Sequence, residues 1–413
     1  MAVRDIKEFA HLNDDELACF GAEIDRIRRE ITDDLGERDV TYIRRAIAIH
    51  RGLEVVARVC LIGSRNRLFW VAGAVLLGTA KSIENTLLGH NISHGQWDWM
   101  NDPEIHSTTW EWDIVIPSSQ WRVAHNNSHH VYTNIRGIDA DLSQKAIRMS
   151  RDTPWHPRHM LQPITNIVYA CLFEYGAAAH HFAVSRRLPR STPDSRRASS
   201  WMLLRKAARQ LVKDYLLIPA LTGRSFRYTV TANLAANTIR NLWMYVTIIC
   251  GHFPDGAEKF EPDVLQNESR AQWHLRQLLG AANFHSGPVL TFLSGGLGYQ
   301  IEHHLFPDLP CNRYPEISVR VRAVCARYDL PYTTGSLVQQ FFTSFRTILK
   351  LSLPDMFLRR TDDDAPETSS EKKFVGVSKP PWRPGFEWRA IDSESGRKRG
   401  LSTAIAQVRA VQG

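Results

Sequence analysis

The sequence predicts an all-α protein: a helical bundle with about four membrane-spanning helices and a cytosolic cap that carries three histidine clusters. Three observations lead to this fold class. Long apolar regions recur along the 413 residues, basic clusters flank several of them, and the clustered histidines lie beside or at the end of apolar regions. The alternative is a soluble helical protein that buries the same regions in its core, and the mean hydropathy of −0.29 favours that alternative.

Composition excludes several classes of protein. With 43% hydrophobic and 10% aromatic residues, the chain does not resemble a disordered protein, a fibre or a small disulfide-bonded protein. Its formal net charge of +8 is mild, and no dense stripe of Lys and Arg indicates a nucleic-acid interface. Six scattered cysteines without a CxxC pair favour a reducing compartment. The charged N-terminus lacks the apolar segment of a secretory signal.

Three regions are expected along the chain. Residues 1–50 are predicted to form a cytosolic helical segment, because Asp14, Asp15 and Glu16 suit a helix start and helical spacing continues to residue 58. Residues 51–355 are predicted to form the membrane domain. Residues 356–413 are polar and rich in proline, and we expect this tail to be largely disordered.

Four apolar regions are candidates for the spanning helices. They are 68–89, 164–184, 228–253 and a weaker one at 287–299. A spanning helix needs about 20 mostly apolar residues, and polar side chains interrupt these regions. Arginines precede the first region and follow the second, as expected at cytosolic ends of spanning helices. We therefore predict a multi-pass membrane protein whose active site faces the cytoplasm.

Histidine is the most informative residue type, because seven of the 17 fall into three compact clusters. The clusters are HxxxH (His90, His94), HxxxHH (His125, His129, His130) and QxxHH (Gln300, His303, His304). Residues four apart share a helix face, so each HxxxH pair can direct two imidazoles at one metal. His130 lies about 100° further round its helix and can face a neighbouring metal.

The ligand types narrow the choice of metal. No cysteine lies in the clusters, and imidazole ligands suit zinc, iron, copper or nickel. A tetrahedral zinc is saturated by four ligands, whereas seven or more imidazoles imply two metals with open positions. This number of ligands favours iron and chemistry with O₂.

The clusters resemble the three histidine boxes of the membrane fatty acid desaturases. The segments GHNISHGQWDWMNDPEIHSTTWEWD, YTNIRGIDAD and IICGHFPDGAEKF are similar to actinobacterial acyl-CoA and acyl-lipid desaturases, and the resemblance extends from Tyr42 to Asp355. It implies a non-haem di-iron centre that uses O₂ and two electrons to place a cis double bond in a saturated acyl-CoA or acyl-lipid. A stearoyl-type substrate and a mid-chain position such as delta-9 are expected. The implied metal ligands are His90, His94, His125, His129, His130, His252, His303 and His304.

Two further sets of residues are candidates for the site. Metal-bound imidazoles usually donate their second N–H to a carboxylate or carbonyl, so four residues are candidate ligands or partners of ligands: Gln300, Asp139, Asp141 and Glu302. For each carboxylate, a solvated or helix-capping role is the alternative. Five tryptophans within 25 residues are expected either to line a narrow acyl tunnel or to anchor the protein at the membrane interface: Trp97, Trp99, Trp110, Trp112 and Trp121.

The electrons must come from another protein, because the chain has no GxGxxG, P-loop, cysteine cluster or haem-binding HPGG motif. The implied donors are a ferredoxin-like carrier and an NAD(P)H reductase. Basic residues between Arg186 and Arg209 are suited to an acidic carrier, a coenzyme A phosphate or anionic lipid. Two other functions stay open: a di-iron fatty acyl hydroxylase or epoxygenase, and a metal-binding helical sensor without turnover.

Overall fold

The computed structural model describes residues 3–139, 141, 147–149, 153–185 and 193–354, together with two short strands near the C-terminus. Helices dominate it, which confirms the predicted all-α class. Strands β1 (Asn283–His285) and β2 (Thr334–Ser336) pair in parallel, and β3 (Ala390–Ile391) pairs with β4 (Lys398–Arg399) in antiparallel register. Apart from β3 and β4, the tail predicted to be disordered lies outside the described residues.

The helices follow one another in three runs, in which η denotes a 3₁₀-helix or π-helix. The first run is α1 (Ile6–Phe9), α2 (Asp14–Asp33), α3 (Glu37–Ile62), α4 (Arg67–Ser82), η1 (Ile83–Gly89), α5 (His90–Ser93), η2 (Asp98–Met100), α6 (Ser118–Ala124), η3 (His125–His129) and α7 (His130–Tyr132). The second is η4 (Pro157–Leu161), α8 (Gln162–Cys171), α9 (Phe173–Ser185), α10 (Pro193–Val212), η5 (Lys213–Leu217), α11 (Ile218–Leu221), η6 (Gly223–Ser225) and α12 (Phe226–His252). The third is η7 (Pro262–Leu265), α13 (Arg270–Gly280), α14 (Pro288–Leu293), η8 (Leu297–Tyr299), α15 (Gln300–Leu305), η9 (Cys311–Arg313), α16 (Tyr314–Arg327) and α17 (Leu337–Lys350).

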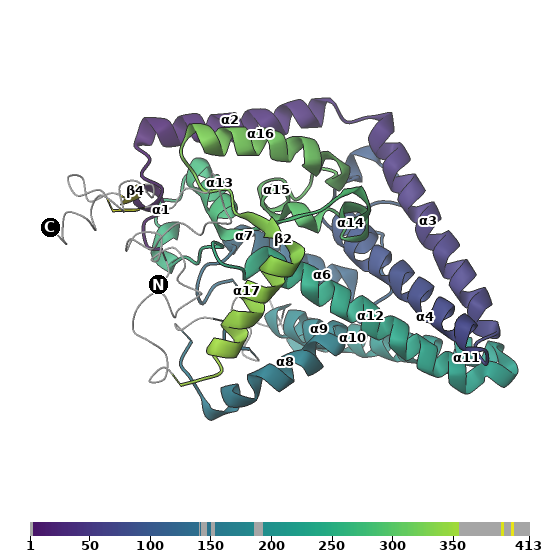
Figure 1. Cartoon of the computed structure of the whole chain (residues 1–413). Coiled ribbons are helices and arrows are strands. Elements are labelled where there is room, and N and C mark those ends of the chain that lie inside the picture. Colours follow the sequence, from purple (N-terminus) through teal and green to yellow (C-terminus); the bar gives the residue numbers. More distant parts are fainter. Residues whose placement is uncertain are drawn as a thin grey trace.

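The predicted apolar regions differ in how they fold. The regions 68–89 and 228–253 form α4 with η1 and α12, which pack against each other and against α3 (Figure 1). The region 164–184 divides into α8 and α9. The region 287–299 forms only the short α14 and η8, because Gly295 and Gly296 have positive φ and reverse the chain between them. Within the described residues, no helix has both the length and the apolar content needed to cross a membrane.

The N-terminal helical region folds back over the rest of the molecule. Helix α2 begins at Asp14, where Asn13 and Glu16 form reciprocal side-chain to backbone hydrogen bonds of 2.8 Å. The helical stretch expected to continue to residue 58 instead breaks at Asp34–Gly36. The buried guanidinium of Arg313 holds this corner by donating to Asp39 Oδ1 at 2.6 Å and to the Asp34 carbonyl at 2.7 Å.

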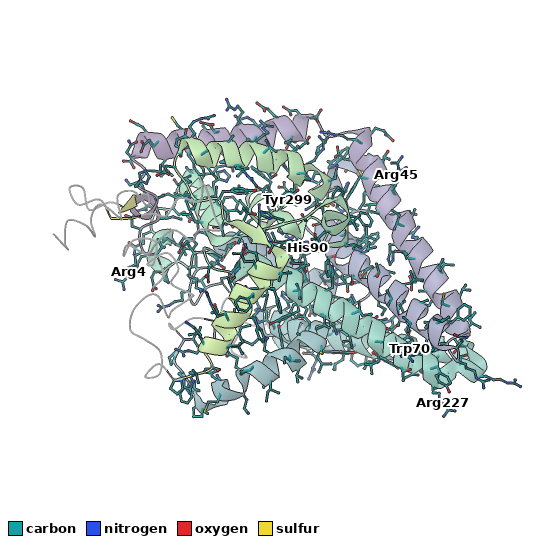
Figure 2. All side chains as sticks on the ribbon, viewed as in Figure 1. Arg4, Arg45, Trp70, His90, Arg227 and Tyr299 are labelled. Carbon is teal, nitrogen blue, oxygen red and sulfur yellow. The ribbon has the colours of Figure 1, made fainter. Side chains whose placement is uncertain are left out.

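The largest apolar core lies beneath α2 and α16, which run side by side in Figure 1. It includes Phe20 from α2 and Ile301 and Leu305 from α15, so the N-terminal helices support the third histidine cluster. His90 and Tyr299 lie in the interior, whereas Trp70 and Arg227 lie at the far tip of the long helices (Figure 2). The histidine clusters therefore sit where the long bundle meets the compact upper part.

Candidate metal centre

Irregular helical turns bring the three histidine clusters together. The π-helix η1 ends immediately before His90, and the π-helix η3 spans His125 to His129. Such π-turns are rare and frequently occur at functional sites. The third cluster lies on α15, and His252 is the last residue of α12. Residues that are far apart in the sequence thus reach one buried region.

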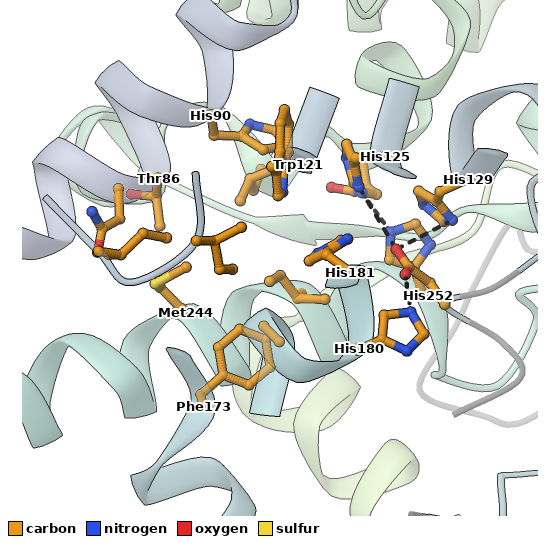
Figure 3. Close-up of a pocket in the computed structure, with 18 of the residues that line it drawn as sticks. Thr86, His90, Trp121, His125, His129, Phe173, His180, His181, Met244 and His252 are labelled. Atoms are coloured by element: carbon orange, nitrogen blue, oxygen red, sulfur yellow. Dashed lines mark hydrogen bonds and ion pairs between the residues drawn. The ribbon is translucent and has the colours of Figure 1, made fainter. Parts of the chain in front are cut away.

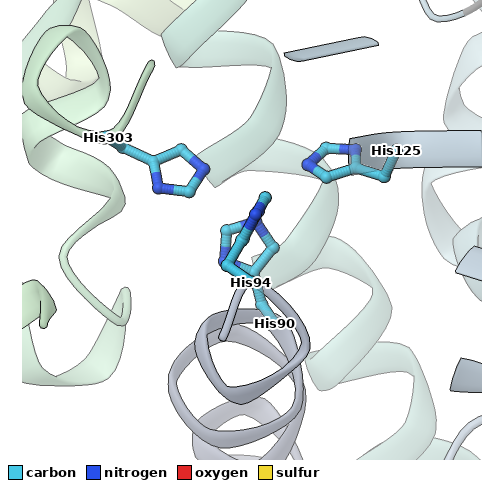
Figure 4. A group of neighbouring side chains, drawn as sticks. All are labelled: His90, His94, His125 and His303. Atoms are coloured by element: carbon cyan, nitrogen blue, oxygen red, sulfur yellow. The ribbon is translucent and has the colours of Figure 1, made fainter. Parts of the chain in front are cut away.

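Two groups of imidazoles form there. The first contains His90, His94, His125 and His303, whose ligating nitrogens all lie within 4.8 Å of one another (Figure 4). The second contains His129, His252 and His304, which meet the same condition. All eight predicted ligands lie in this region, since the His130 ring centre is 4.5 Å from that of His94 and 4.4 Å from that of His304.

The division between the groups differs in part from the prediction. His90 and His94 share one group as expected, but His125 and His129 belong to different groups. Their rings do share a helix face, with centres 5.0 Å apart. The two groups lie side by side along that face, so His125 belongs to the first group and His129 to the second. His130 lies between the groups, with Nε2 3.2 Å from His125 Nε2.

The second ring nitrogens have their own partners. Nδ1 lies 3.1 Å from Asp139 in His129, 3.2 Å from the Tyr314 hydroxyl in His303, and 3.1 Å from Gln277 Oε1 in His304. Within the described part of the chain, Nε2 of all three histidines is buried and has no hydrogen-bond partner, and the same holds for Nε2 of His94. Buried polar atoms normally have partners. Four such nitrogens directed into two imidazole groups fit the binding of metal ions.

Burial and charge set the protonation of these imidazoles. Burial lowers the pKa of His90 to about 4 and that of His125 to about 3, so both are neutral near pH 7, as metal ligation requires. His129 differs from them. Burial alone would lower its pKa, but the carboxylates of Asp139 and Asp141 outweigh that effect and raise the pKa to about 9. Without a metal, His129 is therefore a cation paired with carboxylates.

Gln300 reaches the second group. Its side-chain amide nitrogen lies 2.9 Å from Nε2 of His252, and its buried Oε1 has no partner among the described residues. Gly251 makes this approach possible, because a Cβ at that position would lie 2.8 Å from Cγ and Cδ of Gln300. The predicted ninth candidate thus contacts one ring nitrogen of a predicted ligand.

The three carboxylates have different places. Asp139 is fully buried against His129. Asp141 lies 3.6 Å from His125 Nδ1 and 3.7 Å from His129 Nδ1. Glu302 instead accepts hydrogen bonds from Asn283 and Tyr332, and burial raises its pKa to about 7. Its carboxylate faces β1 and the chain after α16, so the expected role as partner of a histidine ligand does not fit this position.

A cavity of about 90 Å³ adjoins the histidines. Most of its imidazoles gather at one end, whereas His90 lies apart from them and Phe173 and Met244 lie at the other end (Figure 3). Its apolar walls come from α6, α9, α12 and the segment before α6, in which Ile114 and Ile116 lie. The cavity therefore offers a narrow, largely apolar space beside both imidazole groups.

The five predicted tunnel tryptophans are distributed over several places. Trp112 and Trp121 line the cavity, and the Trp121 ring stacks on His125 with centres 4.3 Å apart. Trp97 is buried in the core beneath α2, and Trp99 is 39% exposed. Trp110 lines a separate hollow. For Trp97, Trp99 and Trp110 the expected role in lining the cavity does not fit these positions, because sequence proximity does not fix which side of an irregular loop a ring occupies.

Three residues near the site escaped the sequence analysis. His180 and His181 line the cavity, and His180 Nε2 lies 3.0 Å from Asp141. The adjacent pair of histidines in an apolar region was their only signal. Gln277 contacts His304 and also donates to the His130 carbonyl at 3.0 Å. Nothing in the sequence of α13 distinguishes Gln277 from an ordinary helix residue.

A second hollow, of about 780 Å³, opens beside the cavity. Five cationic side chains line it: Arg51, Arg205, Lys206, Arg209 and Lys213. Three acidic side chains, Glu84, Glu111 and Asp113, line it too, and Glu111 pairs with Lys206 while Asp113 pairs with Lys213. Trp112 lines both this basic hollow and the cavity, so the two spaces are neighbours. The Trp112 side chain therefore lies at the boundary between them.

Comparisons with known proteins agree with this arrangement. A family model described as fatty acid desaturase matches residues 67–336, inside the predicted 51–355 domain. Two strains of Mycobacterium tuberculosis have an NADPH-dependent stearoyl-CoA 9-desaturase that is 51% identical over 99% of this chain and 95% of the relative. The sn-1 linoleoyl-lipid 6-desaturase of Arthrospira platensis is 26% identical over 65% of this chain and 73% of that protein.

Proposed function

Because the chain belongs to the fatty acid desaturase family and is thus an oxidoreductase, we propose that it introduces a cis double bond at the delta-9 position of a saturated acyl-CoA of the stearoyl type. One observation carries the proposal: two groups of imidazoles with unpaired Nε2 atoms border a narrow apolar cavity. The similarity to the mycobacterial stearoyl-CoA 9-desaturases supports the choice of substrate and position.

The proposed cofactor is a pair of non-haem iron ions. The first group and the second group of histidines would each hold one ion, with His130 between them and Gln300 beside His252. Bound iron would supply the reduction of O₂ that drives removal of two hydrogens from the acyl chain. The protein holds the imidazoles in position through their Nδ1 partners, and the apolar walls align a saturated chain and exclude water.

The basic hollow supports a coenzyme A thioester in preference to an acyl-lipid. Lys206 and Lys213 are paired there with Glu111 and Asp113, so the phosphates of coenzyme A would be bound chiefly by the three arginines of the hollow, Arg51, Arg205 and Arg209. Trp112 lines both this hollow and the cavity, so the acyl chain would enter the cavity beside this ring. A thioester bound in this way would have its phosphates in the basic hollow and its middle carbons beside the histidines.

We also propose a multi-pass membrane location with the active site facing the cytoplasm. Many large apolar side chains on α3, α4 and α12 are exposed, among them Val55 (62%), Leu68 (79%) and Leu234 (55%). Extended exposed apolar surface is typical of a protein that contacts lipid or another protein. The proposed electron donors are a ferredoxin-like carrier and an NAD(P)H reductase, and the name of the mycobacterial relatives refers to NADPH.

The test is product analysis with the iron-loaded protein, stearoyl-CoA, O₂ and an added reductase with its carrier. We expect an octadecenoyl product with a cis-9 double bond, and loss of that product in His304→Ala. A hydroxylated or epoxidised product would establish the di-iron hydroxylase or epoxygenase instead. Metal binding by folded protein without any O₂-dependent product would favour the metal sensor.

A further inference from the structure

Aromatic side chains line the end of the cavity furthest from most of its histidines. Tyr169 and Phe173 line the cavity there, with ring centres 5.6 Å apart. Tyr245 contacts both rings at 6.3 and 6.1 Å and is fixed by a 2.7 Å hydrogen bond from its hydroxyl to Asn166. The distal end of the apolar space is thus bounded by the rings of Tyr169 and Phe173, and Tyr245 packs against both of them.

Tyr169 also lines a third hollow, of about 390 Å³, on the surface formed by α8 and α9. The other lining residues are Ile147, Thr165, Val168, Leu172, Tyr175 and Gly176. Among residues of the described chain, Tyr169 is the one that lines both this apolar hollow and the cavity. Its side chain therefore forms part of the wall between them.

The position of the Tyr169 ring depends on Gly176. A Cβ on Gly176 would lie 2.3 Å from Cε2 of Tyr169, so the ring packs directly against the backbone of α9. The side chain is only half-buried and protrudes from the short helix α8. Within the described residues, the Tyr169 ring is therefore the side chain that both spaces share, and its removal would widen each of them at the same point.

The basic hollow, the cavity and the apolar hollow thus lie next to one another and share lining residues. The basic hollow shares Trp112 with the cavity, and the cavity shares Tyr169 with the apolar hollow. We propose that Tyr169 is a specificity-determining residue that ends the acyl site and limits the length of the chain accepted. This inference rests on the proposed function, in which the cavity holds the acyl chain.

The chemistry of the apolar hollow suits the methyl end of a longer chain. Its walls are mainly aliphatic and aromatic, with the hydroxyls of Thr165 and Tyr175 as side-chain polar groups. When the Tyr169 ring is removed, further methylenes of a long chain can leave the cavity and occupy this hollow. Burial of each methylene in apolar surroundings favours binding, so longer substrates gain most from the opening.

The experiment compares Tyr169→Ala with Tyr169→Phe, which keeps the ring, and with Leu172→Ala, which changes only the apolar hollow. Each iron-loaded protein receives an equimolar mixture of stearoyl-CoA and icosanoyl-CoA together with the electron donors. We expect the ratio of icosenoyl to octadecenoyl product to rise about tenfold in Tyr169→Ala, the order expected from two additional buried methylenes. The ratio should stay at the wild-type value in Tyr169→Phe and Leu172→Ala.

A binding measurement separates this inference from the proposed reaction. Non-reactive S-octadecyl-CoA and S-icosyl-CoA thioethers are titrated into metal-free protein, and Tyr169→Leu is included as a milder truncation in case the alanine variant does not fold. We expect Tyr169→Ala and Tyr169→Leu to bind the longer thioether more tightly than the shorter one, and the wild type not to do so. Unchanged preference in a folded truncated variant would overturn the role of Tyr169. Loss of all product in the wild type, with the shift in binding preserved, would instead overturn the proposed reaction.

Discussion

Replacement of Asp139 by asparagine should change how protons and metal compete for His129. Asp139 lies 3.1 Å from Nδ1 of His129, and its charge helps to raise the pKa of that imidazole to about 9. At about pH 7.5 the metal-free imidazole is almost fully protonated, so binding of a metal releases nearly one proton from it. The same competition weakens binding by a factor of roughly 30, which corresponds to the distance of 1.5 units between that pH and the pKa.

The asparagine variant keeps the shape of the side chain but loses its charge. Burial then lowers the pKa of His129 toward or below its ordinary value of 6.5, although Asp141 remains 3.7 Å away. We expect the proton released from His129 to decrease by more than half. Loss of a partner of this kind typically weakens metal binding about 10- to 100-fold. Nearly the full difference should appear near pH 9.5, where both imidazoles are mostly neutral. Near pH 7.5, protonation of His129 in the wild type should reduce the ratio of the two affinities by a factor of up to roughly 30.

The assay is isothermal titration calorimetry of the metal-free protein with Zn²⁺, which has no redox chemistry, in two buffers with different enthalpies of ionisation. Asp98→Asn is the matched control, because Asp98 lies near the first cluster but accepts its hydrogen bonds from Ser107. The control should release the wild-type number of protons. Equal proton release from Asp139→Asn and the wild type, or an affinity ratio that does not change with pH, would refute the argument.

Other substitutions test the remaining geometry. His94→Ala and His304→Ala remove residues of different groups, so each should lower the iron content from about two ions per chain to about one by elemental analysis, and the double variant should contain almost none. Gly251→Ala should displace Gln300 and reduce affinity at the second group about 10-fold in a metal titration, because the new methyl group would lie 2.8 Å from the glutamine side chain. Glu302 has a pKa raised from 4.5 to about 7, so the folded protein loses stability from this residue as the pH rises from 4.5 through 7. In Glu302→Gln this loss, about 3 kcal/mol, should be absent when unfolding in denaturant is followed across that pH range.

The clustered histidines of the candidate centre could be predicted from local spacing, and His252 from the family resemblance, but the division of the centre into two groups could not. HxxxH places two rings on one face in any helical turn, which is why His90 and His94 do meet in one group. The assignment of His125 and His129 to different groups depends on where α12 and α15 cross the helix that carries them. Gln277 illustrates the same limit, since its contact with His304 arises only from the packing of α13 against α15.

The fold shows a similar division between local and tertiary causes. The start of α2 follows from the capping pattern of Asn13 and Glu16, which are three residues apart in the sequence. The break at Asp34–Gly36 depends on Arg313, which is nearly 280 residues away along the chain and binds the corner through Asp34 and Asp39. Residue patterns within one helix therefore predict helix starts more reliably than the corners that tertiary ion pairs hold.

The polarity of the long bundle explains why hydropathy alone favoured a soluble protein. Asn233 and Arg240 on α12 are buried, and Arg240 is paired with the buried carboxylate of Glu174, whereas Leu234 and Leu242 on the same helix are exposed. Polar side chains that face the interior and apolar ones that face outward lower the mean hydropathy of a helix without lowering the apolar content of its outer surface. Polar residues inside membrane bundles face one another in this way because lipid cannot satisfy their hydrogen bonds. The pattern supports the proposed membrane location, and the side of each helix on which a residue lies is therefore more informative than the average over the helix.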